Sequence, residues 1–100
     1  NKVHKLVNGK YIGTGFTQLV SDNSYRSIIV QFNADLSVDN SFGTNGFYVE
    51  NLFTTQANSN YSGSSVIDIN GNLILRVYLF LKNILMVRLM KLNILNAHNI

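Results

Sequence analysis

The sequence lacks cysteine and holds only two histidines, which restricts the metal chemistry that the chain could support. Without cysteine there is no disulfide framework and no thiolate metal site, although the cellular compartment is left open. His4 and His98 lie at opposite ends of the chain, and neither has a second histidine or an acidic residue at ligand spacing. A zinc site is therefore not expected.

Acidic residues are missing from the C-terminal part of the chain. Residues 1–72 carry four basic and five acidic side chains, whereas residues 73–100 carry four basic and none that is acidic. The net charge of +3 therefore belongs to the C-terminal segment and does not form a basic stripe on the rest. Because nucleic-acid binding needs a clustered basic patch, we expect no nucleic-acid partner.

The same C-terminal segment also lacks glycine, serine, threonine and aspartate, all of which are common before it. Three interpretations remain open for it: a strand that continues into a helix, a membrane span, or a shifted reading frame. Its basic residues disfavour a membrane span, since each costs about 2.5–3.5 kcal/mol at the centre of a bilayer. As a helix it has no clean apolar stripe. The break in composition favours the shifted frame.

The most informative stretch is residues 27–46, SIIVQFNADLSVDNSFGTNG. The apolar, β-branched run Ser27–Phe32 predicts a strand. Residues 33–39 are dense in Asn, Asp and Ser, which end strands and stabilise turns. Phe42 lies between turn signals and is expected to fold back as a hydrophobic plug, while Gly43 and Asn45-Gly46 tolerate positive φ.

Similar turn signals divide the rest of the chain into short β-rich runs. Strands are predicted at residues 3–7, 10–17, 26–32 and 46–51, and a loop at 54–64. Asn8-Gly9 predicts a hairpin with a type I′ turn, and Gly13 and Gly15 predict a bulge or a close backbone approach. In the fourth strand, Phe47 and Val49 are expected on one face. The predicted core comprises Ile12, Ile29, Phe32, Phe42, Val49 and Ile67.

The first hairpin pattern returns later in the chain. Residues 65–75 carry Asn70-Gly71 between two apolar runs, and Val7-Asn8-Gly9 aligns with Ile69-Asn70-Gly71 at an offset of about 62 residues. Such an offset predicts tandem units of four strands, each too small to bury its own faces. We accordingly divide the chain into one unit at 1–63, the start of a second at 64–75, and an atypical basic, apolar tail at 76–100.

The central stretch resembles the delta-60 repeat, a bacterial β-propeller-like repeat family. The matching residues are Val30, Phe32, Asn33, Asp35, Ser37, Asp39, Ser41, Phe42, Gly43, Thr44 and Gly46. The chain departs from the family at Leu36, where glycine is usual, and at Asn8 and Asn70, where aspartate is usual. The resemblance implies an all-β fold, with about one four-stranded propeller blade and the start of the next.

The candidate metal site consists of Asn33, Asp35, Ser37 and Asp39, whose side-chain oxygens alternate along the chain as in a calcium loop. The competing interpretation is a turn capped by its own side chains, which these residue types favour. A helix-flanked calcium loop would need glycine and glutamate where Val38 and Thr44 stand. We therefore favour the capped turn and expect no cofactor.

We expect the chain to be a fragment of a larger bacterial protein, since it begins at Asn1 and its first strand starts at once. The expected function is a non-catalytic structural or binding repeat of a secreted or cell-surface protein, whose partners are neighbouring repeats of the same chain. One alternative is part of an enzymatic propeller, glycan-active or quinone-dependent, whose site other blades complete. The other is a small calcium-binding module at the Asp-rich turn. Without the apolar tail, a chain of residues 1–72 should be somewhat more soluble than residues 1–100, which we expect to be poorly soluble or oligomeric, but it should still lack independent cooperative stability.

Overall fold

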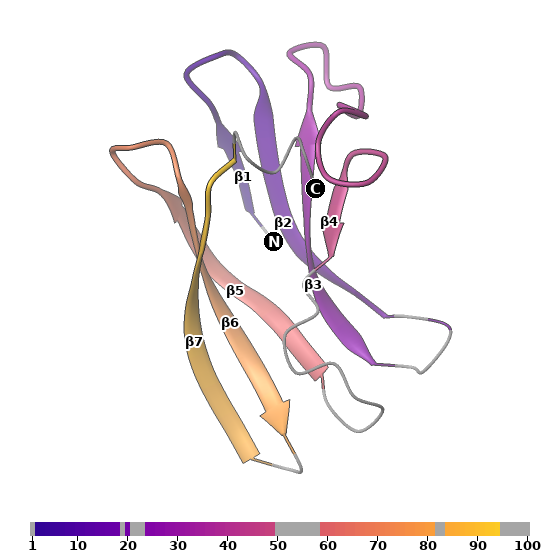
Figure 1. The fold of residues 1–100 in the computed structure, drawn as a ribbon, viewed down its shortest axis with the longest axis vertical. Helices are drawn as coiled ribbons and strands as arrows, with labels where there is room; N and C mark the ends of the chain where they lie inside the picture. The colour runs from indigo at the N-terminus through magenta and orange to yellow at the C-terminus, as the bar shows by residue number, and fades with distance from the viewer. Residues whose placement is uncertain (1, 19, 21–23, 50–58, 82–83, 95–100) are drawn as a thin grey trace.

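The protein is described here from a computed structural model that covers residues 2–18, 20, 24–49, 59–81 and 84–94. These residues form seven strands: β1 Lys2–Lys5, β2 Tyr11–Gln18, β3 Tyr25–Phe32, β4 Phe47–Val49, β5 Ser59–Ile67, β6 Leu73–Leu81 and β7 Ile84–Leu92. The strands build two antiparallel sheets, β1-β2-β3-β4 (sheet A) and β5-β6-β7 (sheet B), seen side by side in Figure 1. The all-β prediction is confirmed for the described residues.

The two Asn-Gly hairpins share one backbone hydrogen-bond pattern. In the first, Gly9 N–H donates to the Leu6 carbonyl at 3.0 Å and Leu6 N–H donates to the Lys10 carbonyl at 2.7 Å. In the second, Gly71 N–H donates to the Asp68 carbonyl at 3.0 Å and Asp68 N–H donates to the Asn72 carbonyl at 2.8 Å. Both turns lie at the same end of the molecule (Figure 1). The residue offset of 62 thus relates two structurally equivalent hairpins.

The type I′ turn predicted at Asn8-Gly9 is wrong, and the second hairpin does not form one either. Only the glycines take positive φ, +87° at Gly9 and +79° at Gly71, whereas a type I′ turn also needs positive φ at the preceding asparagine. The bonds instead describe a type I turn followed by a glycine in the left-handed region, the common three-residue hairpin loop. Asn8 contributes its side chain, whose Oδ1 accepts the Lys10 N–H at 3.0 Å.

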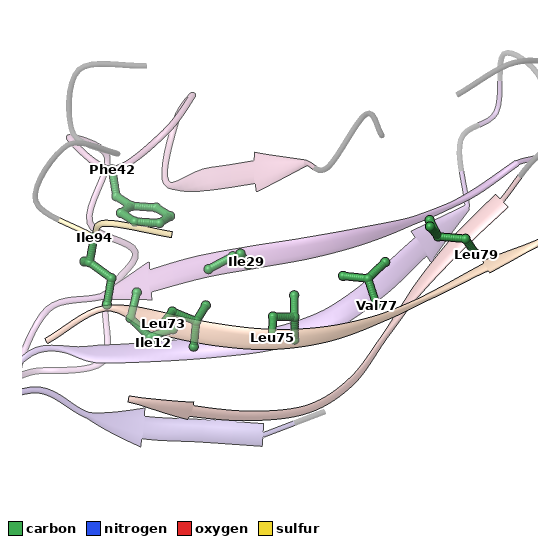
Figure 2. Packing of buried hydrophobic residues seen from close by; sticks show 8 residues of the cluster. All are labelled: Ile12, Ile29, Phe42, Leu73, Leu75, Val77, Leu79 and Ile94. Atoms are coloured by element: carbon green, nitrogen blue, oxygen red, sulfur yellow. The ribbon is translucent and has the colours of Figure 1, made fainter. Parts of the chain in front are cut away.

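The core lies between the sheets (Figure 2). Ile12 on β2 and Ile29 on β3 are 0% and 1% exposed, and they face a row of four apolar side chains along β6. The row comprises Leu73, Leu75, Val77 and Leu79, all at most 1% exposed. Phe42 and Ile94 lie at one end of this core. Three of the six predicted core residues are therefore buried, while Phe32, Val49 and Ile67 are only half-buried.

Two of the half-buried residues, Val49 and Phe32, follow from the pairing of the strands, whereas Ile67 packs against the core from its edge. Val49 lies opposite Ile28 and Phe32 opposite Tyr11, which places both on the face of sheet A turned away from sheet B. In β4 the core-facing residue is Tyr48, opposite Ile29 and packed against the core, whereas Phe47 is 41% exposed. Phe47 and Val49 do share one face, as predicted, but it is the outer face, so the predicted burial of Val49 is wrong.

The loop after β3 confirms the prediction of a plug. Phe42 is 0% exposed, and the loop around it uses positive φ at Gly43 (+55°), Asn45 (+54°) and Gly46 (+95°). Gly46 N–H donates to the Phe42 carbonyl at 2.8 Å, which closes the loop over the ring. A side chain at Gly46 would collide with Val38. Glycine is required there for space as well as conformation.

In the C-terminal segment, Leu73–Leu81 and Ile84–Leu92 form two strands, β6 and β7, that pair antiparallel. The interpretation of this segment as a strand continuing into a helix is therefore wrong, and no helix in the described residues is long and apolar enough to cross a membrane. The loop predicted at 54–64 is also wrong where it can be judged, because β5 begins at Ser59, while residues 54–58 lie outside the described residues. The Ser and Asn residues of this segment are typical of a loop, but they belong here to a strand that pairs with β6.

Gly13 and Gly15 sit in an unbroken ladder between β2 and β3, so the predicted bulge is wrong. The neighbours of Gly13 are side chains and not the close backbone that was predicted, since an added Cβ would lie 3.2 Å from Val30 Cγ1 and 3.4 Å from Phe32 Cε2. The absence of a side chain at Gly13 therefore lets these two residues lean across β2 on the outer face of sheet A.

Candidate functional site

Asp39 is the centre of a polar cluster that joins the turn before β2, strand β3 and the loop after β3. Its Oδ2 accepts from Lys10 Nζ at 2.8 Å and from Gln31 Nε2 at 2.7 Å. Its Oδ1 accepts from the Ser41 backbone N–H at 3.1 Å and from the Ser41 hydroxyl at 2.6 Å. Asp39 is 6% exposed and Gln31 is 0% exposed, so the bond between these two side chains is buried, whereas the bonds from Lys10 and Ser41 are only partly buried.

The Lys10 ammonium, with the Ser41 hydroxyl next, holds the pKa of Asp39 well below its ordinary value. The side chain therefore stays ionised at neutral pH and cannot act as an acid there. Four donors already occupy its two oxygens. This arrangement fixes the loop that carries Phe42 against β3, which is a structural task.

The other three candidate metal ligands form a separate turn. Ser37 donates to Asp35 Oδ1 through its backbone N–H at 3.0 Å and through its hydroxyl at 2.6 Å, while Asn33 Nδ2 donates to Ser37 Oγ at 3.0 Å. The hydrogen bonds from Ser37 lower the pKa of Asp35. The side chains thus cap their own turn, and Asp39 points instead to Lys10 and Gln31. Among the described residues, no group of three His, Cys, Asp or Glu side chains could hold a metal ion.

This turn is a third copy of the hairpin turn geometry. Leu36 N–H donates to the Asn33 carbonyl at 2.9 Å and Asn33 N–H donates to the Ser37 carbonyl at 2.8 Å. Leu36 therefore stands where Gly9 and Gly71 stand in the hairpins, and it takes a φ of +72°. The turn keeps its shape although glycine is missing, and Leu36 is placed in a conformation that costs a leucine roughly 1–2 kcal/mol.

A serine and a histidine that the sequence did not connect meet across the two sheets. His4 Nε2 on β1 lies 2.8 Å from Ser65 Oγ on β5, and Thr14 Oγ1 lies 3.3 Å from the same hydroxyl. Burial, followed by the nearby charge of Lys2, lowers the pKa of His4 and so favours its neutral form. Ser65 is 6% exposed, and within the described part of the chain no carboxylate orients the ring. The contact holds the sheets together and lacks the access that a nucleophile needs.

A candidate binding surface is the outer face of sheet A, which is turned away from sheet B. One row across its four strands consists of Val3, Gly13, Val30 and Phe47. Val3 is 62% exposed and Phe47 is 41% exposed. A depression of about 450 Å³ lies here, with Val3, Gly13, Val30 and Phe32 among its lining residues. Such a continuous apolar face is typical of a surface that another layer covers.

Sheet B also has an apolar outer face. Val66, Val87 and Leu89 are 56%, 54% and 71% exposed, and Ile74 lies between them on β6. Arg76 and Lys91 share this face, so its charge is positive. The molecule therefore consists of two packed sheets whose two outer faces are both largely apolar.

Comparison of the chain with protein-family models, with curated proteins and with solved structures found no match in any of the three.

Proposed function

We propose that this chain is a non-catalytic structural or binding repeat, in which each sheet is one blade-like unit of a tandem array. The array is a β-propeller of the delta-60 kind, in a secreted or cell-surface bacterial protein. Its immediate partners are neighbouring repeats of the same chain, which cover the outer faces of sheets A and B.

The observation that carries the proposal is the way sheet B lies on sheet A. Sheet B contacts sheet A through the face that bears Leu73, Leu75 and Val77. At the offset of 62, these residues correspond to Tyr11, Gly13 and Gly15, which belong to the outer face of sheet A. The sheets thus pack front to back, as successive units of an array do, and not through equivalent faces.

The polar clusters support a structural role over catalysis. Asp39 is bound by four donors, and His4 bonds to the buried hydroxyl of Ser65. Each of these groups links different parts of the fold, and neither opens onto the apolar faces.

A tandem fusion tests the proposal. A copy of residues 1–62 is joined to the N-terminus of residues 1–100, which preserves the offset between hairpins. The added unit should cover the outer face of sheet A and raise the midpoint of thermal unfolding, because repeat arrays gain stability from each new interface. An unrelated domain of similar length, fused at the same place, is the control. Equal midpoints for the two fusions would contradict the array.

A further inference from the structure

We infer that the outer face of sheet A binds the outer face of sheet B in a second copy of this chain, so that free chains associate head to tail. This inference rests on the proposed function, since it applies the packing of sheets A and B to contacts between molecules. Beyond the proposed function, it names the two surfaces that meet and states that the chains associate head to tail.

The first step of the argument concerns the outer face of sheet B. By strand pairing, Ile74 and Leu89 occupy the positions in sheet B that Ile12 and Ile29 occupy in sheet A. Ile12 and Ile29 are the buried residues on which sheet B packs. Leu89 is instead 71% exposed. Sheet B therefore repeats, on its exposed face, the apolar pair that forms the core on sheet A.

The second step concerns the outer face of sheet A. The residues of sheet B that enter the core include Leu75 and Met90, whose counterparts by strand pairing are Gly13 and Val30. These two lie in the apolar row on the outer face of sheet A and line the depression of about 450 Å³. Each outer face is thus the counterpart of one side of an interface that already exists within the chain.

The third step concerns the symmetry of assembly. The two outer faces differ from one another, so a contact between them is heterologous and leaves one free face at each end. Such contacts build open chains or rings and do not stop at a symmetric dimer. Both outer faces carry basic residues, Lys5 on sheet A and Arg76 and Lys91 on sheet B. Association should therefore strengthen as salt screens their repulsion.

Sedimentation velocity on the full chain tests this inference. Mass should grow with protein concentration and with ionic strength. Val3→Lys on sheet A and Leu89→Lys on sheet B should each raise the concentration needed for association by roughly tenfold or more, since each places a charge in an apolar contact. Val7→Lys is the matched control, because Val7 is fully exposed at a hairpin turn and belongs to neither face. Thermal unfolding of dilute samples checks that the variants fold.

Mixing the variants gives the decisive result. Val3→Lys chains keep an intact sheet B face and Leu89→Lys chains keep an intact sheet A face, so the mixture should form heterodimers and nothing larger. A wild-type chain that stays monomeric, or Leu89→Lys chains that dimerise alone, would overturn the inference. If the tandem fusion is stabilised while free chains do not associate, this inference fails and the proposed function stands. If neither occurs, both fail.

Discussion

At the scale of the residue, Leu36 occupies a position that two other turns of this chain give to glycine. Its φ of +72° is costly for leucine, and its side chain is 65% exposed, so little burial offsets the cost. We expect Leu36→Gly to stabilise the protein by roughly 0.5–1 kcal/mol. The substitution relieves the strain of a positive φ, but part of this gain is lost because glycine has more conformational entropy in the unfolded chain. Urea unfolding measures this. Leu36→Ala keeps the strained conformation and should bring no such gain; an equal gain would show that the turn is not strained.

Asp39 makes stability depend on pH. Its pKa is lowered in the folded chain by Lys10 and Ser41, so the unfolded chain binds more protons near the ordinary pKa of about 3.9. This contribution is present above that value and is lost as pH falls through and below it. In thermal melts between about pH 6 and pH 2, Asp39→Asn should flatten part of the acid-side decline, by the linkage between proton binding and stability. Lys10→Met should flatten the acid-side decline less, because Ser41 still lowers the pKa of Asp39 in that variant. Unchanged pH curves in both variants would show that the cluster is not coupled to folding.

At the scale of the element, the loop from Val38 to Phe47 depends on Gly46 for two separate reasons. Gly46 has a positive φ, and a side chain there would collide with Val38. Gly9 has a similar φ but open space around it. Gly9→Ala should therefore cost roughly 1–2 kcal/mol for conformation alone. Gly46→Ala should cost roughly 1–3 kcal/mol more because of the overpacking. Denaturant titration measures the free energy of unfolding of both variants. Equal losses would show that position 46 does not lie against Val38 in the folded protein.

The sequence was informative where local chemistry decides the structure. The strand before Asn33, the capped turn after it and the buried Phe42 all follow from residue types within a short window. The face of β4 could not be predicted, because all three of its residues, Phe47–Val49, are apolar and show no alternation. Its pairing with β3 decides which side chain is buried.

The polar clusters could be predicted only in part, for the same reason. The hydrogen bonds from Ser37 to Asp35 and from Ser41 to Asp39 span two residues, which turn-forming chemistry anticipates. The pairs Lys10–Asp39 and His4–Ser65 span 29 and 61 residues. They exist because strands and sheets bring distant segments together, and no local signal in the sequence marks them.

At the scale of the whole molecule, the segment after residue 72 is part of the core. Within the part of the chain that the structure describes, eight apolar residues are buried, and four of them lie on β6, where they cover Ile12 and Ile29. The expectation that a chain ending at residue 72 would be the more soluble is therefore at odds with this packing. Losing one such side chain costs about 2–5 kcal/mol of stability. The loss of four is therefore comparable to the whole free energy of unfolding of a typical domain, about 5–15 kcal/mol.

We accordingly expect residues 1–72 to lack a cooperative thermal transition and to aggregate, because sheet A would then expose both of its faces. The full chain should unfold cooperatively under the same dilute conditions. Calorimetry and light scattering on the two chains measure the difference. The single variant Leu75→Asp provides an independent comparison, since it keeps the length of the chain while placing a charge in the same core. It should lose the transition as well. A sharp transition in residues 1–72 would mean that sheet A folds alone and that its contact with sheet B adds little to its stability.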